Sequence, residues 1–347
     1  MLGYKRPKFL IFVSPELKFS YVDTRLGDAL LFILLLIELI LLALILLPLV
    51  ALSGDYYLLD LLSNFQLHFF ILALFFCIPL LLKSVKLGVL SAFLSIIIFA
   101  SSHLWWFSNK VPLSSGYLDT PHKLHIVQAN LSYYNPLLRT AVEELIELGA
   151  DLYLFYEFNR KQKPLFVEIA DKRYTFGDDD YDSFPDGMGI ISKYPLSNIK
   201  KHKILPIKGS VITLTLQLPN QKLDLILLHP PSPRSPDKWQ KRNVLLGSVQ
   251  PLVELASSKH ILVAGDFNTT PWSNHFPHHH QITPCYQQTD MYVSWHASKY
   301  LHPYGWLTGL PIDHCLTSKS VKVYQFKTHS LPGSDHLALD YKIFLID

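Results

Sequence analysis

The stretch Ile261-Leu-Val-Ala-Gly-Asp-Phe-Asn268 joins an apolar run to a carboxylate and an amide that stand two residues apart. Four consecutive aliphatic residues are typical of a buried strand, and Asp266 and Asn268 follow at its carboxyl end. A hard metal ion and a phosphate group need fixed oxygen ligands and hydrogen-bond donors, which the end of a buried strand can hold rigidly. Alone, this stretch could equally be an ordinary junction between strand and turn. It gains weight because polar residues stand at comparable strand ends elsewhere in the chain.

Six such sites follow apolar runs between residues 122 and 347. Taken singly, each has a structural explanation, because an asparagine can serve as a turn residue, a histidine can be a satisfied core residue and an aspartate can cap a strand. Taken together, they supply the carboxylates, amides and imidazoles that a phosphate-binding centre requires. The six sites are Asn130, Glu157, His229, Asp266 with Asn268, Asp313, and Asp335 with His336.

These residues predict a division of roles. Glu157 is suited to bind Mg²⁺, with Asp335 and Asn130 alongside, because Mg²⁺ prefers one or two carboxylates and completes its shell with water and substrate oxygens. Mn²⁺ could take the place of Mg²⁺ at such a site.

The remaining residues are suited to the reaction itself. Asp313 could hold one ring nitrogen of His336 and leave the other free to meet phosphate or water. Asp266 could orient or deprotonate the attacking water. Asn268 and His229 could donate to the phosphoryl oxygens as charge develops on them. The pattern therefore predicts hydrolysis of a phosphate ester, where catalysis consists mostly of positioning and charge stabilisation.

Charge is distributed very unevenly along the 347 residues. Residues 1–121 contain 8 Lys and Arg and 7 Asp and Glu, whereas residues 122–347 contain 23 and 21. The second part is long enough for one sizeable core. Its net charge of +2 is too small to indicate a nucleic-acid partner by electrostatics alone.

Within the first part, residues 1–107 contain three hydrophobic stretches, at about 29–52, 65–82 and 87–107. Each is close to the ~20 residues that a helix needs to cross a bilayer. A cleaved signal peptide would explain only one of them. We therefore expect a three-helix transmembrane anchor, in which Glu38 is protonated and faces the bundle interior.

The short loops predict how this anchor is oriented. Basic residues precede the first span, and Lys83 and Lys86 lie between the second and third. The loop between the first two spans has Asp55 and Asp60 but no Lys or Arg. By the positive-inside rule the N-terminus is cytoplasmic, so everything after the third span lies outside the cytoplasm. The basic residues before the first span are Lys5, Arg6, Lys8, Lys18 and Arg25.

Residues 108–121 are predicted to be a linker, and strands then alternate with helices. Strands are expected at 124–129, 152–156, 189–192, 212–218, 223–228, 260–265, 312–317, 321–327 and 337–345. Helices are expected after Asn135-Pro136 and from Ser235-Pro236 to about Ala256. Because the helices are too few to cover one parallel sheet on both faces, the pattern favours two packed mixed sheets with helices outside.

In this order, the polar segments resemble those of the endonuclease/exonuclease/phosphatase superfamily, which includes deoxyribonuclease I and exonuclease III. The resemblance covers nearly all of residues 122–347. The segments that carry it are Gln128–Asn130, Tyr156-Glu157, Gly187–Leu196, Leu228-His229, Gly265–Ser273, Pro311–His314 and Gly333–His336.

The resemblance implies a four-layer α/β sandwich and metal-dependent hydrolysis of phosphoric esters. It is closest to small bacterial members with N-terminal spans, which implies an integral protein of the bacterial inner (cell) membrane. By position, the family's metal and catalytic residues are matched by Asn130, Glu157, His229, Asp266, Asn268, Asp313, Asp335 and His336.

Several interpretations remain open at this point. The leading one is a membrane-anchored Mg²⁺-dependent phosphodiesterase, nuclease-like and acting on nucleic acid. A phospholipid or phosphoinositide-type phosphoesterase is the close alternative, and a non-catalytic membrane scaffold is an alternative of another class. A transporter is disfavoured because three spans with one acidic residue offer no path. The sequence indicates no protein partner.

Two further features have more than one explanation. The segment between Asn268 and Asp313 is rich in Trp, Tyr and His, so it could stack bases, enter the membrane interface or simply pack as a loop. Within it, His278–His280 could bind a transition metal or lie exposed. An oxidising compartment would permit a disulfide between Cys285 and Cys315 if their Cα atoms come within ~7 Å.

Overall fold

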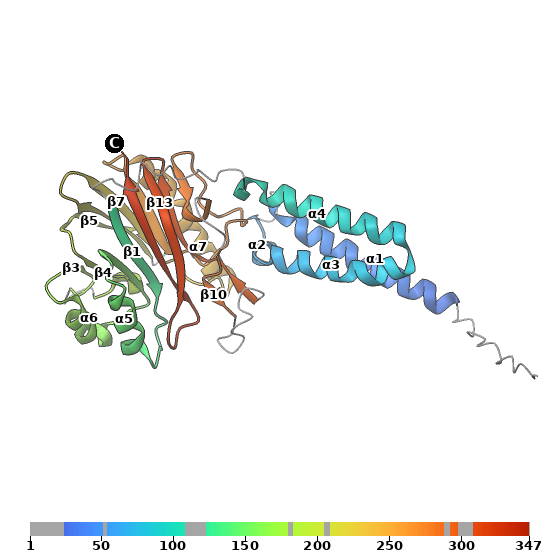
Figure 1. Ribbon diagram of the computed structural model, residues 1–347, viewed down its shortest axis with the longest axis horizontal. Coiled ribbons are helices and arrows are strands. Elements are labelled where there is room, and N and C mark those ends of the chain that lie inside the picture. Colours follow the sequence, from blue (N-terminus) through green and yellow to red (C-terminus); the bar gives the residue numbers. More distant parts are fainter. Residues whose placement is uncertain are drawn as a thin grey trace, which may run out of the picture.

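The computed structural model describes residues 24–50, 54–107, 123–179, 183–204, 209–287, 292–297 and 308–346. The predicted linker 108–121 lies outside the described residues, as do Lys5, Arg6, Lys8 and Lys18. The described part consists of a helical bundle and a domain of two six-stranded sheets (Figure 1).

The first sheet has the strand order β13-β14-β1-β2-β4-β3 and is mixed, because β1 and β2 are parallel and the other pairs are antiparallel. Its strands are β1 (Lys123–Asn130), β2 (Leu152–Tyr156), β3 (Tyr174–Phe176), β4 (Gly189–Ser192), β13 (Val321–Ser330) and β14 (Leu337–Leu345).

The second sheet has the order β5-β6-β7-β8-β12-β9, with β7 and β8 parallel. Its strands are β5 (Leu196–Lys203), β6 (Ser210–Gln217), β7 (Lys222–Leu228), β8 (Ile261–Asp266), β9 (Ile282–Pro284) and β12 (Asp313–Ser318). A separate pair is formed by β10 (Trp295–His296) and β11 (Gly309–Leu310).

The strands are buried on both faces, because each sheet packs against the other sheet on one face and against helices on the other. In β8, Leu262 and Ala264 join the core between the sheets, while Val263 packs in the core under the outer helices. The layers are therefore helix, sheet, sheet, helix, which confirms the predicted four-layer sandwich. The covering helices are α5 (Leu138–Glu147) and α6 (Lys163–Ala170) on the first sheet, and α7 (Pro236–Gly247) and α8 (Val249–Glu254) on the second.

The helix ends follow the local sequence. Ser235 caps α7 by accepting a hydrogen bond from the backbone amide of Lys238, and Pro236 occupies the first turn. The single helix expected from there to Ala256 is interrupted at Ser248 and consists of two helices. Gly149, with a φ of 68°, follows α5, as a residue in the left-handed region commonly does after a helix.

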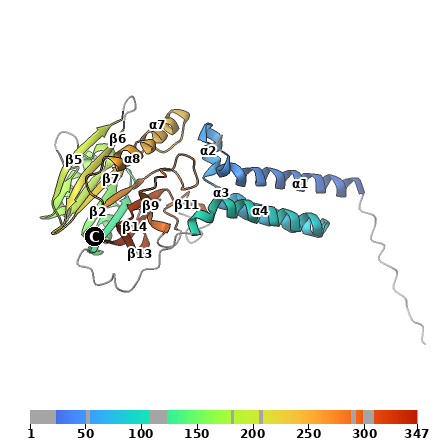
Figure 2. The same ribbon diagram turned by 90° about the horizontal axis from the view of Figure 1, so that it is seen from above.

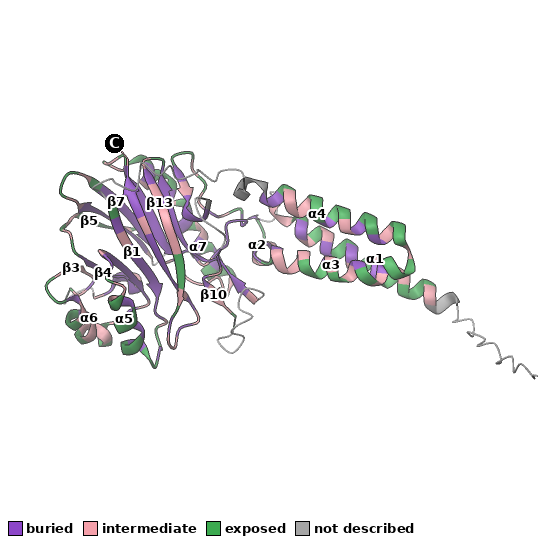
Figure 3. Ribbon diagram, in the orientation of Figure 1, coloured by how far each residue is buried: buried purple, intermediate pink, exposed green. Residues whose placement is uncertain are grey.

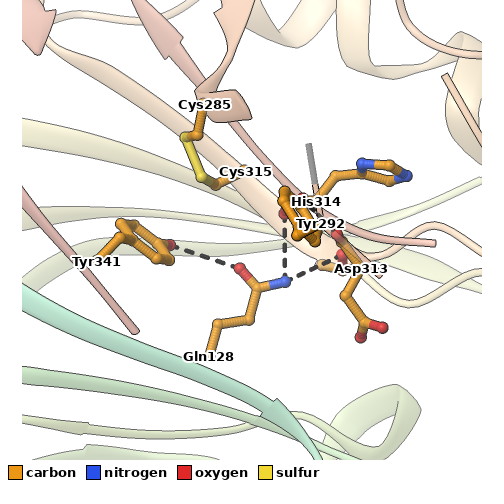
Figure 4. The surroundings of a disulfide bond; sticks show 8 residues. Gln128, Cys285, Tyr292, Asp313, His314, Cys315 and Tyr341 are labelled. Carbon is orange, nitrogen blue, oxygen red and sulfur yellow. Dashed lines mark hydrogen bonds between the residues drawn. A yellow bond between two sulfur atoms is a disulfide. The ribbon is translucent and has the colours of Figure 1, made fainter. Parts of the chain in front are cut away.

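Gln128 and the cysteine pair lie between the sheets (Figure 4). Gln128 on β1 donates from Nε2 to the carbonyls of Gly265 and His314, and so joins the first sheet to the second. Cys285 and Cys315 form a disulfide with a Cα–Cα distance of 5.5 Å. The pairing that the sequence left open is therefore present, and it ties the segment after β9 to β12.

Three helices are long and apolar enough to span a membrane. They are α1 (Thr24–Leu46), followed by the short η1 (Leu47–Leu49), α3 (Gln66–Lys83) and α4 (Val85–Phe107). They lie side by side (Figures 1 and 3), and many of their exposed residues are large and apolar. Glu38 is buried in the bundle, as expected, and Cys77 contacts its carboxylate.

The loop between α1 and α3 contains a short helix, α2 (Tyr57–Ser63), that the sequence did not predict. Figure 2 places α2 beside α7 of the sandwich, and Tyr57 and Asp60 hydrogen-bond to that domain. The loop with Lys83 and Lys86 lies at the other end of the bundle, since α3 and α4 run antiparallel from there.

Candidate metal and phosphoester site

The strand register brings most of the predicted site residues to one edge of the sandwich. Asn130 ends β1 opposite Tyr156, so Glu157 follows on the parallel neighbour. On the other sheet, Asp266 at the end of β8 pairs with Asp313 at the start of β12. His229 follows β7, and His336 immediately precedes β14.

The first cluster is centred on two carboxylates. Glu157, His229 and Asp266 each offer a ligand atom within 4.8 Å of the others. The Nδ2 of Asn130 donates to Glu157 Oε1 at 3.1 Å and to Asp266 Oδ2 at 3.0 Å. The Nε2 of His229 lies 3.7 Å from Glu157 Oε1 and 3.9 Å from Asp266 Oδ2. Two carboxylates from different sheets thus converge on one amide and one imidazole.

The second cluster shares Asp266 with the first. Asp266, Asp313 and His336 again have ligand atoms within 4.8 Å of one another. His336 Nδ1 lies 2.8 Å from Asp313 Oδ2, and its Nε2 lies 3.9 Å from Asp266 Oδ2. Asp313 therefore holds one ring nitrogen, as expected from the residue types, and the other ring nitrogen faces Asp266.

Burial and charge shift the pKa values in this cluster. Burial and the neighbouring Asp313 raise the pKa of Asp266 to about 6, against the lowering effect of His336 and His229. For His336, burial lowers the pKa, but the carboxylates of Asp313 and Asp266 outweigh it and raise the pKa to about 10. The imidazole of His336 is therefore cationic at neutral pH, and it faces the carboxylate of Asp266.

Asn268 lies beside Asp266 and restrains it. Its backbone amide donates to Asp266 Oδ1 at 2.9 Å, and its Nδ2 donates to Asp266 Oδ2 at 3.2 Å and to the carbonyl of Pro230 at 3.1 Å. Asn268 and Glu157 both have positive φ, at 51° and 66°, which L-residues adopt at some cost. Such conformations concentrate at functional sites, where the surroundings hold them in place.

Asp335 differs from the other two predicted metal ligands. Its Oδ2 accepts a hydrogen bond from the indole Nε1 of Trp295 at 2.9 Å, and its carbonyl accepts from His296. Among the described residues, Asp335 belongs to neither cluster of possible metal ligands, and the same holds for His278–His280.

Some residues at the site were not predicted. The backbone amide of Tyr133 donates to Glu157 Oε2 at 2.8 Å, and its ring lies 6.5 Å from that of His229. The carbonyl of Asp186 accepts from His229 Nδ1 at 2.9 Å, which leaves Nε2 facing the carboxylates. A signal for Tyr133 was its place three residues after Asn130, in the turn that follows β1.

The aromatic segment after Asn268 is described only in part. Trp272, Phe276 and Tyr286 are buried, so for them the packed-loop interpretation applies. Residues 298–307, which include several of its aromatic side chains, lie outside the described residues.

The donors at the site fit a small divalent cation. Glu157 and Asp266 present hard carboxylate oxygens to a shared space, and the side chain of Glu157 remains 22 % exposed. Asp313 Oδ1 is buried without a hydrogen-bond partner among the described residues. A buried carboxylate oxygen needs a cation or water beside it. In this structure, Asn130 Oδ1 accepts a hydrogen bond from the backbone amide of Ser132, and Asn130 Nδ2 points toward the carboxylates of Glu157 and Asp266.

Comparison with known proteins agrees with this fold. The model of the Endonuclease/Exonuclease/phosphatase family matches residues 117–336. The chain therefore belongs to this family and is a metal-dependent phosphoric ester hydrolase. No curated protein matches the chain.

Solved structures share the sandwich at low sequence identity. A structure of D. rerio TDP2 has a TM-score of 0.53 at 18 % identity, covering 64 % of this chain and 98 % of that one. A truncated Caenorhabditis elegans TDP2 has 0.51 at 14 %, covering 64 % and 97 %. An endonuclease/exonuclease/phosphatase family protein from Bacteroides thetaiotaomicron has 0.51 at 15 %, covering 66 % and 99 %.

Proposed function

We propose that the protein is a membrane-anchored, Mg²⁺-dependent phosphodiesterase with nuclease-like chemistry. The single observation that carries this proposal is the convergence of Glu157, Asp266 and His336 from three different segments onto one centre. In this account, residues 1–107 form the anchor, 108–121 the linker and 122–347 the catalytic domain.

Each residue of the centre has a distinct task in the proposed reaction. Glu157 is proposed to hold the metal. Of the other two predicted ligands, Asn130 presents its amide nitrogen to the carboxylates in this structure and Asp335 accepts from Trp295, so each would have to turn toward the ion to bind it. The bound metal supplies a Lewis acid that neutralises phosphoryl charge. Asp266 accepts a hydrogen bond or a proton from the attacking water.

Charge that develops on phosphorus is stabilised by the donors around Asp266. The cationic His336, held by Asp313, presents its Nε2 proton toward that space. His229 Nε2 faces the same space, because Asp186 engages the other nitrogen. Asn268 fixes the orientation of Asp266 and is proposed to donate to the phosphoryl group when substrate binds.

The catalytic domain is proposed to face away from the cytoplasm in a bacterial inner membrane. The α1–α3 loop contacts the sandwich, so both lie at the same end of the bundle, opposite Lys83 and Lys86. The positive-inside rule assigns the end with the lysines to the cytoplasm. The Cys285–Cys315 disulfide supports the same assignment, because disulfides persist in oxidising compartments.

The substrate class is proposed to be nucleic acid, with phospholipid as the second candidate. One D. rerio TDP2 structure is described as complexed with single strand DNA product, which supplies a precedent within this fold. The phospholipid candidate is favoured by the docking of α2 on the sandwich, which keeps the domain near the bilayer surface.

The test presents the full-length protein in lipid nanodiscs with Mg²⁺ or Mn²⁺, separately with plasmid DNA, single-stranded DNA and phospholipid vesicles. Cleavage of DNA that is lost in Asp266→Asn, but kept in Asp237→Asn on the exposed face of α7, is the expected result. Lipid cleavage alone would replace the nuclease assignment by the phospholipase-like one. If none of these substrates is cleaved with either metal, the proposed phosphodiesterase activity fails.

A further inference from the structure

The loop between the first two spans docks on the sandwich through a buried carboxylate. Asp60 of α2 is 1 % exposed and accepts hydrogen bonds from three side chains of the sandwich domain. Oδ2 accepts from Trp239 Nε1 at 2.9 Å and from Arg242, and Oδ1 accepts from Ser273 Oγ at 2.6 Å. All three donors belong to α7 or to the segment after Asn268.

Arg242 connects Asp60 to the centre of the site. Its guanidinium is fully buried and donates from Nη1 to the backbone carbonyl of Asn268 at 3.2 Å. Asn268 in turn donates twice to Asp266. The chain of contacts from Asp60 through Arg242 to Asn268 therefore ends on the carboxylate that is proposed to activate water.

A second residue of the same loop holds the next part of this segment. Asn64 Oδ1 accepts from both the backbone amide and the hydroxyl of Thr270 at 2.8 Å. Further along, His275 Nε2 lies 2.8 Å from the carbonyl of Gly54, and the ring of Trp272 lies 5.4 Å from that of His103 on α4. Residues 268–275 are thus fastened to the membrane bundle at several points.

The energetics of a buried ion pair indicate that the contact between Asp60 and Arg242 does more than attach α2 to the sandwich. A buried ion pair adds little net stability compared with apolar residues of the same shape, but removal of one partner leaves an uncompensated buried charge. Burial lowers the pKa of Arg242, while Asp60 opposes that shift and favours the charged form. The directional hydrogen bonds of the pair fix α7 and Asn268 in one arrangement relative to α2.

We propose that the α1–α3 loop is a structural part of the catalytic site. Asp60 is a positioning residue that acts through Arg242 on Asn268, and Asn64 positions Thr270. This inference rests on the proposed function for its kinetic consequence, though not for the docking itself. It implies that the site reaches its working geometry only when the membrane hairpin is folded against the sandwich.

The experiment compares full-length variants in nanodiscs by steady-state kinetics and by hydrogen exchange of residues 268–274. Asp60→Asn and Asn64→Ala are expected to lower kcat about 10- to 100-fold with little change in KM, since small misplacements of catalytic groups cost this much. Asn64→Ala should also speed the exchange of the Thr270 amide, because this amide loses its acceptor. Asp237→Asn, which breaks only the exposed pair with Lys241 on the same helix, serves as the matched control.

A double variant separates positioning from stability. Compared with Asp60→Leu alone, Asp60→Leu with Arg242→Met removes the uncompensated buried charge, so the thermal midpoint should rise, although Trp239 Nε1 and Ser273 Oγ still lack their acceptor. Because the backbone carbonyl of Asn268 no longer accepts a hydrogen bond from Arg242, kcat should stay low. Recovery of kcat together with the midpoint would reduce the pair to a structural role and overturn the positioning assignment.

The exchange readout keeps the two proposals distinguishable. The wild type could prove inactive while its Thr270 amide is protected from exchange and the same amide in Asn64→Ala is not. That result would refute the proposed function and leave the docking intact. Unchanged exchange and unchanged kcat in both Asp60→Asn and Asn64→Ala would overturn the inference, whatever the wild type hydrolyses.

Discussion

His336 Nδ1 lies 2.8 Å from Asp313 Oδ2, and this contact joins the two sheets across the site. Asp313 begins β12 on one sheet, and His336 precedes β14 on the other. The pair also holds the second ring nitrogen of His336 toward Asp266. The position of a charged donor at the proposed phosphate site therefore depends on how the sheets pack.

Asp313→Asn should abolish this orientation while it keeps the shape of the side chain. Without the carboxylate, the imidazole loses the charge that raises its pKa and the acceptor that fixes Nδ1. We expect kcat to fall about 10²- to 10⁴-fold, the range for a positioned acid–base group. His336→Ala should cost a similar factor, with circular dichroism unchanged in both.

The double variant checks whether the two residues act as a unit. Asp313→Asn combined with His336→Ala should be no slower than the worse single variant, because residues that work together are not additive. Multiplied losses would show that Asp313 and His336 act independently, contrary to the assigned roles.

Glu157→Gln is expected to weaken metal binding. The substitution keeps the size of the side chain but removes the charge of the carboxylate that the account assigns to the ion. The Mg²⁺ concentration for half-maximal activity should rise about tenfold or more. Glu143→Gln on the exposed face of α5 is the control, and an unchanged metal requirement in Glu157→Gln would remove it from the ligand set.

The disulfide should contribute stability without taking part in the chemistry. Cys285 and Cys315 are 30 residues apart in sequence, and closing a loop of this length is worth about 4 kcal/mol in the chain-entropy model. Replacing both by serine should lower the thermal midpoint, while kcat measured well below that midpoint stays near the wild-type value. An equal midpoint with and without reductant would show that the bond is absent in the protein.

His314 should make the protein sensitive to acid. Burial lowers the pKa of His314 to about 4, against the opposing effect of the Thr269 carbonyl, which lies 2.8 Å from Nε2. The unfolded chain binds this proton below about pH 6.5 and the folded chain only below about pH 4. The stability that neutral His314 contributes is therefore fully present above pH 6.5 and is lost as the pH falls toward 4, by about 3 kcal/mol in total.

The matching variant is His314→Gln, which can keep a donor to Thr269 but does not titrate. Thermal midpoints of the two proteins, measured from pH 7 to pH 4.5, should converge or cross as the wild type loses stability more steeply. Parallel curves would contradict the assignment of a neutral buried imidazole.

Much of the sandwich could be predicted because its central strands are regular in sequence. The run before Asp266 and the alternation of Ile212, Leu214 and Leu216 with polar residues mark strands whose apolar faces are buried. The edge strand β5 was not predicted, because its exposed residues Lys200 and Lys201 give it no apolar face. Charged edges of this kind protect a sheet from pairing with another chain.

The site could be predicted by residue type but not by partner. Polar residues at strand ends indicated Glu157, Asp266 and His336, since neighbouring strand ends meet at one edge. The bond between Asp335 and Trp295 and the role of the Asp186 carbonyl depend on loop conformations that have no periodic signal.

The docking of α2 was beyond the sequence for a different reason. From the sequence, Asp60 was one of two acidic residues in a short loop between spans, and it supported the predicted orientation. Its partner Arg242 stands 182 residues later, beside Lys238 and Lys241. Only the packing of the bundle against α7 makes the pair, and no local pattern encodes that contact.

The most direct test of the account locates the metal. Crystals of the full-length protein soaked with Mn²⁺ and measured for anomalous scattering should give a peak at coordination distance, about 2.1 Å, from a Glu157 carboxylate oxygen and within the space bounded by Asn130 and Asp266. The peak should vanish or weaken in Glu157→Gln. A peak elsewhere in the molecule, or none at millimolar Mn²⁺, would contradict a metal-dependent phosphoester site at this edge of the sandwich.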